Sequence, residues 1–574
     1  MEKKSKTRQS PIQNNGKKTK EASTRVPNPL EKLRLSELVL HKMHKDLGNL
    51  EYLIAKDNAD LSEEFDSKLS FFATPEECAK RFIDSLVSKV FLKDRHDPTP
   101  KIFLKHTFQS RLGTHCIFGL QYQGFEIEEH SFAVHVDKNN HVVMVCCTYL
   151  PYLPKLLGKP FEALREDMIR QEIAKIGEYE SAAGEKQWLM IWDEKNQAYE
   201  LFPGDQVKLT LSKSQTKKRR STTVVYIFKR DANVYEVKEL NNSAGLSDQT
   251  VGLGEVIRKF EEKKTRSLST LMNLTPSEAI LQDMESSSEL IGKYAAIKDE
   301  IQTVYTTERH GIFLGETGSA FDRVTAYYHL DHIQRYFRER LGFRLLDEYS
   351  HLNPVTLVLR SETTHVAEYD INAEKIMFYK LGSNNFTAVR DPRLVYHEFV
   401  HAVTDAIARL HRAGQEQSPR TKEILQAQAM DEGIADYFAC SLAQRQGAKK
   451  ALAYYMKSKR TWGIVRDLDP KRGARGADES VSVKIQELQD RTAWKTKKYE
   501  LAQLWGQYLW QLRKSLGDDI ADMLIAHSIF FLTRWATFEQ GGEAILLTDR
   551  LLFSGQHQES IGILREVVNK VKFV

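Results

Sequence analysis

The stretch DPRLVYHEFVHAVTD, residues 391–405, contains two histidines four residues apart, with a glutamate directly after the first. Asp391 and Pro392 are typical of an N-cap and a first helical position. Neither glycine nor proline follows until Gly414. The stretch therefore predicts a helix that begins at residue 392 and carries both histidines.

On such a helix, His397 and His401 lie one turn apart on the same face, so both imidazoles can reach one metal ion. Glu398 is rotated by about 100° from His397 and can approach a water molecule without becoming a ligand itself. A catalytic zinc ion needs a third protein ligand and an open position. The five-residue pattern is short, and two structural histidines on an amphipathic helix are the alternative.

A second acidic pair strengthens the metal hypothesis. In AMDEGIADYFA (429–439), Glu432 and Asp436 are again four residues apart, within an otherwise apolar segment. Two carboxylates that face a core are costly unless they are paired or bind a metal. Glu432 suits the third ligand, and Asp436 suits the acceptor that orients a metal-binding imidazole. The alternative is a helix whose acidic residues point to solvent.

These two motifs resemble those of the thermolysin/fungalysin group of zinc metallopeptidases, the gluzincins. HEFVHAVTD is similar to the thermolysin-type HExxHAVTD helix, and MDEGIADYFA resembles the fungalysin-type GEGxxDFFA segment. The resemblance implies one zinc ion and a general base that acts on water. It implies that His397, His401 and Glu432 bind zinc, that Glu398 is the base, that Asp436 is the partner of a zinc-bound histidine, and that Asp405 is a second supporting acid.

The segment HVAEYDINAEKIMFYKLG (365–382) is typical of two strands around a turn at Asn372-Ala373. In the family, the corresponding edge strand pairs with an extended substrate. The resemblance therefore implies that Ala367, Glu368 and Tyr369 bind substrate. The family usually has Asn-Ala at the start of this strand, where this chain has Val366-Ala367. An ordinary hairpin that covers the active-site helix is the alternative.

The segment YELAQLWGQYLWQL (499–512) resembles the fungalysin pattern HxxGxxWxxxL, whose histidine stabilises the oxyanion. Aligned on Trp505 and Leu509, the histidine position falls on Tyr499 and the glycine position on Ala502. A tyrosine hydroxyl can donate a hydrogen bond to an oxyanion, so the resemblance makes Tyr499 a candidate catalytic residue. The same departure from the pattern also fits an impaired enzyme.

Composition and charge limit the partners and the location of the chain. The formal net charge of the 574 residues is only +5, which gives no nucleic-acid footprint. Residues 1–30 are basic and poor in apolar side chains, which predicts a disordered tail without the apolar core of a secretory signal. No apolar run could span a membrane, and five cysteines do not suggest a disulfide framework. The sequence predicts a cytoplasmic protein, with secretion by a non-Sec route as the alternative.

The N-terminal half is expected to form propeptide domains. Alternating apolar residues in 107–151 predict an antiparallel sheet, and VHVDKNNHVV (134–143) is similar to the FTP propeptide module. The order of a helix and then strands in 160–228 resembles a PepSY module, with a generic α+β domain as the alternative. The predicted divisions are a tail (1–30), a helical segment (31–95), an FTP-like domain (96–155), a PepSY-like domain (156–236), a charged helical linker (237–295) and a catalytic domain (296–574).

The sequence thus predicts an α+β protein. N-terminal domains of antiparallel sheet and helix precede a catalytic domain with a mixed α+β upper part and a mainly helical C-terminal part. The expected function is a zinc-dependent endopeptidase that acts on peptides or proteins and is inhibited by its own prodomain. The alternative is a catalytically impaired zinc protein that binds peptides or regulates a partner. The intact Glu398 favours the enzyme, because a purely structural site has no use for a base.

Overall fold

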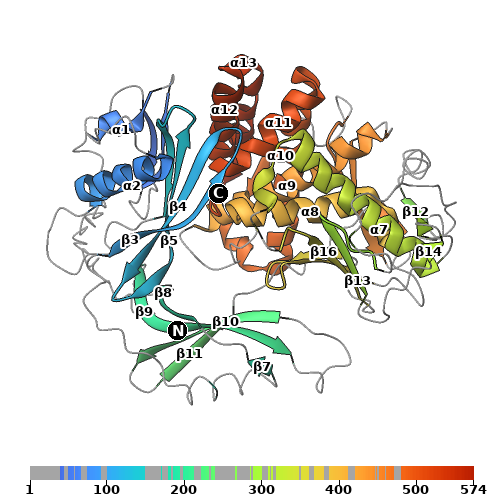
Figure 1. Cartoon of the computed structure of the whole chain (residues 1–574), viewed down its shortest axis with the longest axis horizontal. Coiled ribbons are helices and arrows are strands. Elements are labelled where there is room, and N and C mark those ends of the chain that lie inside the picture. Colours follow the sequence, from blue (N-terminus) through green and yellow to red (C-terminus); the bar gives the residue numbers. More distant parts are fainter. Residues whose placement is uncertain are drawn as a thin grey trace, which may run out of the picture.

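The computed structural model combines helices with several sheets, which makes the chain an α+β protein (Figure 1). It describes residues 39–43, 50–56, 59–65, 74–91, 100–148, 170, 179–181, 185–193, 198–211, 222–231, 234–239, 265–267, 285, 289–299, 308–309, 312–313, 318–347, 349, 351–360, 367–379, 387–410, 420–446, 448, 451–458, 461–470 and 480–574. Within this part of the chain, no helix is both long and apolar enough to cross a membrane.

An antiparallel sheet dominates the N-terminal part, and its strands lie in the spatial order β1-β2-β6-β5-β4-β3. They are β1 (Val39–Met43), β2 (Leu50–Ala55), β3 (Lys101–Gln109), β4 (Gly113–Tyr122), β5 (Phe125–Asp137) and β6 (Val142–Cys147). A turn at 138–140 joins β5 to β6. The sheet expected within 96–155 is therefore present, and it extends to strands that precede it in the sequence.

Those preceding strands correct the prediction of a helical segment over 31–95. Val39–Met43 and Leu50–Ala55 are strands, and Tyr52 pairs with Cys146 of β6. Leu40 of β1 pairs with Ile54 of β2, and β2 pairs in turn with β6, so partners that are distant in the sequence make these segments strands. Helices do occur later in the segment, at α1 (Leu61–Glu64), α2 (Pro75–Leu86) and the π-helical turn η1 (Val87–Phe91).

The helix α2 covers one face of this sheet. A capping box fixes its start, because Thr74 Oγ1 accepts from the Glu77 amide while the Glu77 carboxylate accepts from the Thr74 amide. Its buried residues recur at helical spacing and pack with the sheet. Every residue of β6 is buried, with Cys147 in the core under α2 and Cys146 in a different core on the opposite face. The sheet is therefore packed on both faces.

A second group of strands follows in the region predicted as PepSY-like. It comprises β7 (Tyr179–Ser181), β8 (Glu185–Asp193), β9 (Ala198–Leu211), β10 (Thr222–Asp231) and β11 (Val234–Glu239). The strands predicted within 187–228 lie in β8, β9 and β10. A single bridge between Ile127 and Trp188 joins this group to the first sheet. The helix expected at the start of this region lies largely outside the described residues.

The linker contains a strand where helix was predicted. Within 237–295, Thr265–Ser267 form β12, which pairs with β20 (Thr461–Asp467), and β20 pairs in turn with β19 (Leu452–Ser458). A short β-strand in a charged segment cannot be recognised from its own residues, because backbone hydrogen bonds to a partner strand distant in the sequence stabilise it. Most of the remaining linker lies outside the described residues.

The part of the chain after residue 290 begins with a mixed four-stranded sheet. Its order is β13-β16-β18-β17, and β17 is antiparallel to β18 at one edge. The strands are β13 (Ala295–Asp299), β16 (Val355–Arg360), β17 (Ala367–Asp370) and β18 (Lys375–Tyr379). The hairpin predicted around Asn372-Ala373 is thus present as β17 and β18. Two helices, α7 (Gly318–Arg335) and α8 (Pro392–Ala408), pack together beside this sheet.

The described residues after 420 are mainly helical, as predicted. The helices are α9 (Thr421–Arg445), α10 (Arg491–Leu516), α11 (Asp518–Ser528), α12 (Phe538–Phe553), α13 (Gln558–Ile561) and α14 (Leu564–Lys570). A buried carboxylate links three of them, because Asp522 of α11 accepts hydrogen bonds from Tyr437 and Ser441 of α9 and from Arg513 of α10. The short strands β21 (Val481–Val483) and β22 (Val571–Phe573) pair with each other.

The N-terminal sheet and the C-terminal helices share one hydrophobic core, which we call the seam. It includes Phe108 and Cys146 from the sheet, and Phe530 and Phe531 from the 3-10 turn η6 (Ile529–Phe531). The Cys146 thiol lies 3.6 Å from the Phe531 carbonyl oxygen, to which it donates. Figure 1 shows the blue sheet directly beside the red helix α12. The two parts are therefore joined by one continuous buried core.

A pair of buried histidines lies in the seam. The Nδ1 atoms of His115 and His135 are 2.6 Å apart, so one ring donates to the other. The ring of Phe531 lies 4.8 Å from that of His135. Burial lowers the pKa of His115 well below its usual value and that of His135 to about 3. Both rings are therefore neutral in the folded protein at neutral pH.

This pair predicts a loss of stability in mild acid. The unfolded chain binds a proton at His135 below pH 6.5, whereas the folded chain resists it until about pH 3. The contribution of His135 to the free energy of unfolding is therefore fully present above pH 6.5. It falls progressively below that pH, by about 2 kcal/mol at pH 5. Denaturation of the wild type and His135→Gln at pH 7 and pH 5 measures this effect. We expect the variant to lose about 2 kcal/mol less than the wild type, and equal losses would contradict the assignment.

Candidate metal centre

The helix α8 begins as the sequence predicts. The Asp391 carboxylate accepts a hydrogen bond from the Arg393 amide at 2.9 Å, and Pro392 occupies the first helical position. The helix ends where Arg409 adopts a left-handed conformation, with φ of 55°, and its amide bonds back to the Thr404 carbonyl. Most of α8 is buried between the mixed sheet and α9, so its polar side chains must find partners within the protein.

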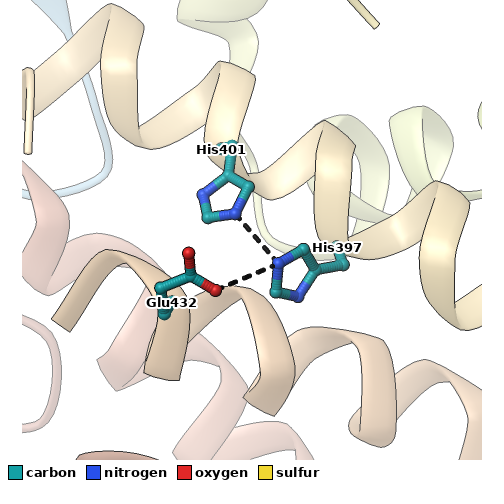
Figure 2. A group of neighbouring side chains, drawn as sticks. All are labelled: His397, His401 and Glu432. Carbon is teal, nitrogen blue, oxygen red and sulfur yellow. Dashed lines mark hydrogen bonds and ion pairs between the residues drawn. The ribbon is translucent and has the colours of Figure 1, made fainter. Parts of the chain in front are cut away.

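Three side chains converge between α8 and α9 (Figure 2). His397 Nε2 lies 2.9 Å from His401 Nε2 and 3.5 Å from Glu432 Oε2. One ligand atom from each residue fits within a span of 4.8 Å, and all three side chains are buried. Tetrahedral ligands held 2.0–2.1 Å from one zinc ion would lie about 3.3 Å apart. The observed spacing therefore suits a single ion.

The other nitrogen of each imidazole faces a buried carboxylate. His397 Nδ1 lies 3.0 Å from Asp436 Oδ1, and His401 Nδ1 lies 2.8 Å from Asp431 Oδ2. These contacts favour the tautomer with hydrogen on each Nδ1. Two Nε2 lone pairs and the Glu432 carboxylate then point at one another, which is unfavourable unless a proton or a cation lies between them.

The protonation of the histidines reflects this requirement. Burial opposes the charge on His397, but hydrogen bonds to Asp436 and Glu432 outweigh burial and raise its pKa to about 10. Burial is the largest influence on His401 and lowers its pKa, although Asp431 acts in the opposite direction. Without a metal, one proton on His397 therefore supplies the positive charge that the three converging groups demand.

Asp431 is the partner of His401 that the sequence analysis missed. Its neighbour Glu432 is the predicted ligand, and Asp431, one residue before it, points about 100° away around the helix. Asp431 also accepts a hydrogen bond from the Thr404 hydroxyl of α8. The only sequence signal for Asp431 was a second acidic residue beside Glu432 in an apolar segment. The structure shows that its carboxylate is fully buried and therefore needs a partner.

Removing the Asp431 carboxylate is expected to weaken zinc binding. Partners of metal-bound histidines are typically worth about 10–100-fold in metal affinity. We expect Asp431→Ala to raise the zinc dissociation constant by about this factor, whereas Asp431→Asn keeps an acceptor oxygen and has a smaller effect. Competition with a chromophoric chelator measures both constants. An unchanged constant in Asp431→Ala would show that Asp431 does not orient His401.

A close approach of α9 and α10 brings further groups to the site. A methyl group at Gly433 would lie 2.9 Å from both the Ala502 carbonyl oxygen and Trp505 Cδ1. Because Gly433 directly follows Glu432, this approach places α10 against the candidate ligand Glu432. Lys498 of α10 bonds to Glu432 Oε1 at 2.7 Å. Burial opposes ionisation of Glu432, but Lys498 and the hydrogen bond from His397 hold its pKa well below the usual range.

Two further candidate residues from the sequence, Tyr499 and Glu398, lie on α10 and α8. Tyr499 lies on α10, where the Lys498 ammonium is 4.4 Å and the Arg466 guanidinium 4.9 Å from its ring centroid. Its hydroxyl oxygen is buried. Glu398 is 2% exposed and lies on α8 between the two histidines. Tyr499 therefore lies beside two cations that contact Glu432, and Glu398 shares the helix of the two histidines.

The predicted substrate strand packs against α8. Ala367, Glu368 and Tyr369 belong to the edge strand β17, which packs against α8. The Tyr369 hydroxyl donates to Asp405 Oδ2 at 3.4 Å. Asp405 therefore ties the end of α8 to the edge strand. The Glu368 carboxylate accepts from the Tyr379 hydroxyl of β18, and Val366 lies outside the described residues.

The donor set is one that zinc accepts: two imidazoles with oriented tautomers and one carboxylate. A structural zinc site ordinarily has four protein ligands, whereas three ligands leave a position for water or substrate. Among the described residues, no other group of histidine, cysteine and acidic side chains converges in this way. Searches of the sequence against models of known families and against curated proteins found no match, so the assignment depends on these residues.

Proposed function

We propose that this protein is a zinc-dependent endopeptidase of the gluzincin type, made with an inhibitory N-terminal prodomain. The observation that carries this proposal is the convergence of His397 Nε2, His401 Nε2 and Glu432 Oε2, while both Nδ1 atoms face carboxylates. This arrangement directs two imidazole nitrogens and one carboxylate oxygen at one point. Converging lone pairs do not stabilise packing, but they can bind a cation.

The residues of the chain take distinct roles in this proposal. His397, His401 and Glu432 would hold the ion. When bound, zinc would polarise the scissile carbonyl and make the attacking water more acidic. The Glu398 carboxylate removes a proton from that water and passes it to the leaving amine. The Tyr499 hydroxyl is the candidate donor to the oxyanion.

An extended peptide would bind along β17, whose edge position permits addition of a further strand. The strand precedes α8 in the chain and contacts it through Tyr369 and Asp405. A peptide paired with β17 would therefore be held relative to the helix that carries both histidines. The proposed substrate is accordingly a protein segment in extended conformation.

The inhibitor in this proposal is the N-terminal part of the chain. It comprises the FTP-like sheet and the PepSY-like strands, and a charged linker joins it to the catalytic domain that begins near residue 296. Support comes from the seam, which fixes the sheet to the C-terminal helices, and from β12, which fixes part of the linker to β20. A cut within Thr265–Ser267 is disfavoured, because a protease needs an extended segment whose backbone is not already paired.

The test combines zinc content with hydrolysis of a fluorogenic casein. The full chain is measured intact, and again after the linker is cut at a site inserted between Glu239 and Thr265 and the N-terminal fragment is digested. We expect one zinc ion per chain and hydrolysis only after digestion. Zinc without hydrolysis in either state would favour the alternative function, a zinc-containing peptide-binding or regulatory protein. Absence of zinc binding would overturn the metal centre.

A further inference from the structure

A buried lysine contacts the carboxylate that would bind the metal. Lys498 is 1% exposed, and its Nζ atom lies 2.7 Å from Glu432 Oε1. Lysine is rarely buried to this extent unless it is paired. The Oε2 atom of the same carboxylate is the one that points toward His397. The two oxygens of Glu432 are therefore directed at different positive partners.

A second buried cation supports the same carboxylate. The Arg466 guanidinium lies 3.6 Å from Glu432 Oε2 and also bonds to Asp436, at 2.9 Å for one of the two contacts. Glu432 and Asp436 thus share two buried cations, Lys498 and Arg466.

We propose that Lys498 is a positioning residue that holds Glu432 as a one-oxygen metal ligand. Occupied by the ammonium group, Oε1 is withheld from the ion, and only Oε2 remains to bind it. The ion then keeps an open position, which a catalytic site requires and a two-oxygen carboxylate would fill. This inference rests on the proposed metal centre but concerns a residue outside its ligand set.

The same charge also limits the affinity of the site. A positive charge beside a ligand repels a divalent cation, so the site binds the ion less tightly than its donor set alone would allow. The direction in which metal affinity changes when this charge is removed distinguishes two roles of Lys498. If Lys498 acted only as packing, its loss would loosen Glu432 and weaken metal binding. If it acts as proposed, its loss strengthens metal binding.

The test measures Zn²⁺ and Co²⁺ binding to the full chain by competition with a chelator. We expect Lys498→Met to bind Zn²⁺ at least about tenfold more tightly than the wild type, since even in water Coulomb's law gives an effect of this order. The visible absorption of bound Co²⁺ reports the number of ligands. We expect it to be weaker in Lys498→Met, because a second carboxylate oxygen joins the ion.

Lys495→Met is the matched control. Lys495 lies on the same helix with its ammonium 5.7 Å from the Tyr499 ring centroid, and it is less buried than Lys498. We expect its affinity and Co²⁺ absorption to match those of the wild type. Lys498→Gln, which retains a hydrogen-bond donor without charge, serves if the methionine variant does not fold. For this variant we also expect tighter binding, with Co²⁺ absorption close to that of the wild type.

The outcomes separate this inference from the proposed function. Failure of the wild type to bind either ion would overturn the metal centre and this inference together. Binding by the wild type, with equal or weaker binding by Lys498→Met and Lys498→Gln, would overturn the role of Lys498 alone. A change of the same size in Lys495→Met would show that any nearby positive charge has this effect. That result would also overturn the specific role of Lys498.

Discussion

Replacement of Glu398 by glutamine is expected to reduce peptide hydrolysis by about 10²–10⁴-fold, the usual contribution of a general base. Glutamine has nearly the same shape but cannot accept a proton at neutral pH. Glu398 belongs to α8, whose start is fixed by the Asp391 cap, so the substitution leaves the neighbouring histidines in place. We therefore expect the zinc content and the unfolding temperature of Glu398→Gln to equal those of the wild type.

The measurement compares initial rates on the casein substrate with zinc content determined on the same samples. Glu500→Gln is a suitable control, since Glu500 is an exposed residue of α10 that pairs with Lys497. It should change neither quantity. Full activity in Glu398→Gln would contradict the assigned base, whereas loss of zinc would show that the residue supports the ligands instead.

Truncation of Phe531 to alanine is expected to destabilise the N-terminal sheet and the C-terminal helices together. Phe531 is fully buried in the seam, and its carbonyl oxygen accepts from the Gln540 side chain at 3.2 Å. A buried Phe→Ala substitution typically costs about 3–5 kcal/mol. Because the core is continuous across the seam, we expect one cooperative transition for both parts, shifted to lower denaturant concentration.

Hydrogen–deuterium exchange locates this effect. In Phe531→Ala, amides of β6 in the sheet and of α12 among the helices should lose protection to the same extent. Phe553→Ala is the control, because Phe553 lies at the C-terminal end of α12, is only half-buried and packs against His557. It should affect α12 more than β6. Independent loss of protection in Phe531→Ala would mean that the two parts unfold separately.

The sequence predicted the elements whose signals are local. The Asp-Pro start of α8 and the four-residue spacings placed His397, His401 and Glu432 on facing helices, and the alternation around Asn372 located the β17–β18 hairpin. These patterns depend on neighbours within a few residues, so they can be recognised without the fold.

What the sequence did not predict depends on distant partners. β1 and β12 become strands because β2 and β20 pair with them. Lys498 looks like one of many lysines on a polar helix, and only the close approach of α10 at Gly433 directs it at Glu432. The role of Asp431 was missed for the same reason, since the rotation of α9 relative to His401 decides it.

The seam has a consequence for the order of events after the linker is cut. A broken peptide bond removes no buried area, and the aromatic and aliphatic side chains of the seam stay in contact. The nicked protein should therefore remain a two-chain complex that elutes as one species in gel filtration. Activation would then be timed by how fast the N-terminal fragment dissociates or is degraded. Mild acid, which charges the histidine pair only once the seam has opened, would favour the dissociated state.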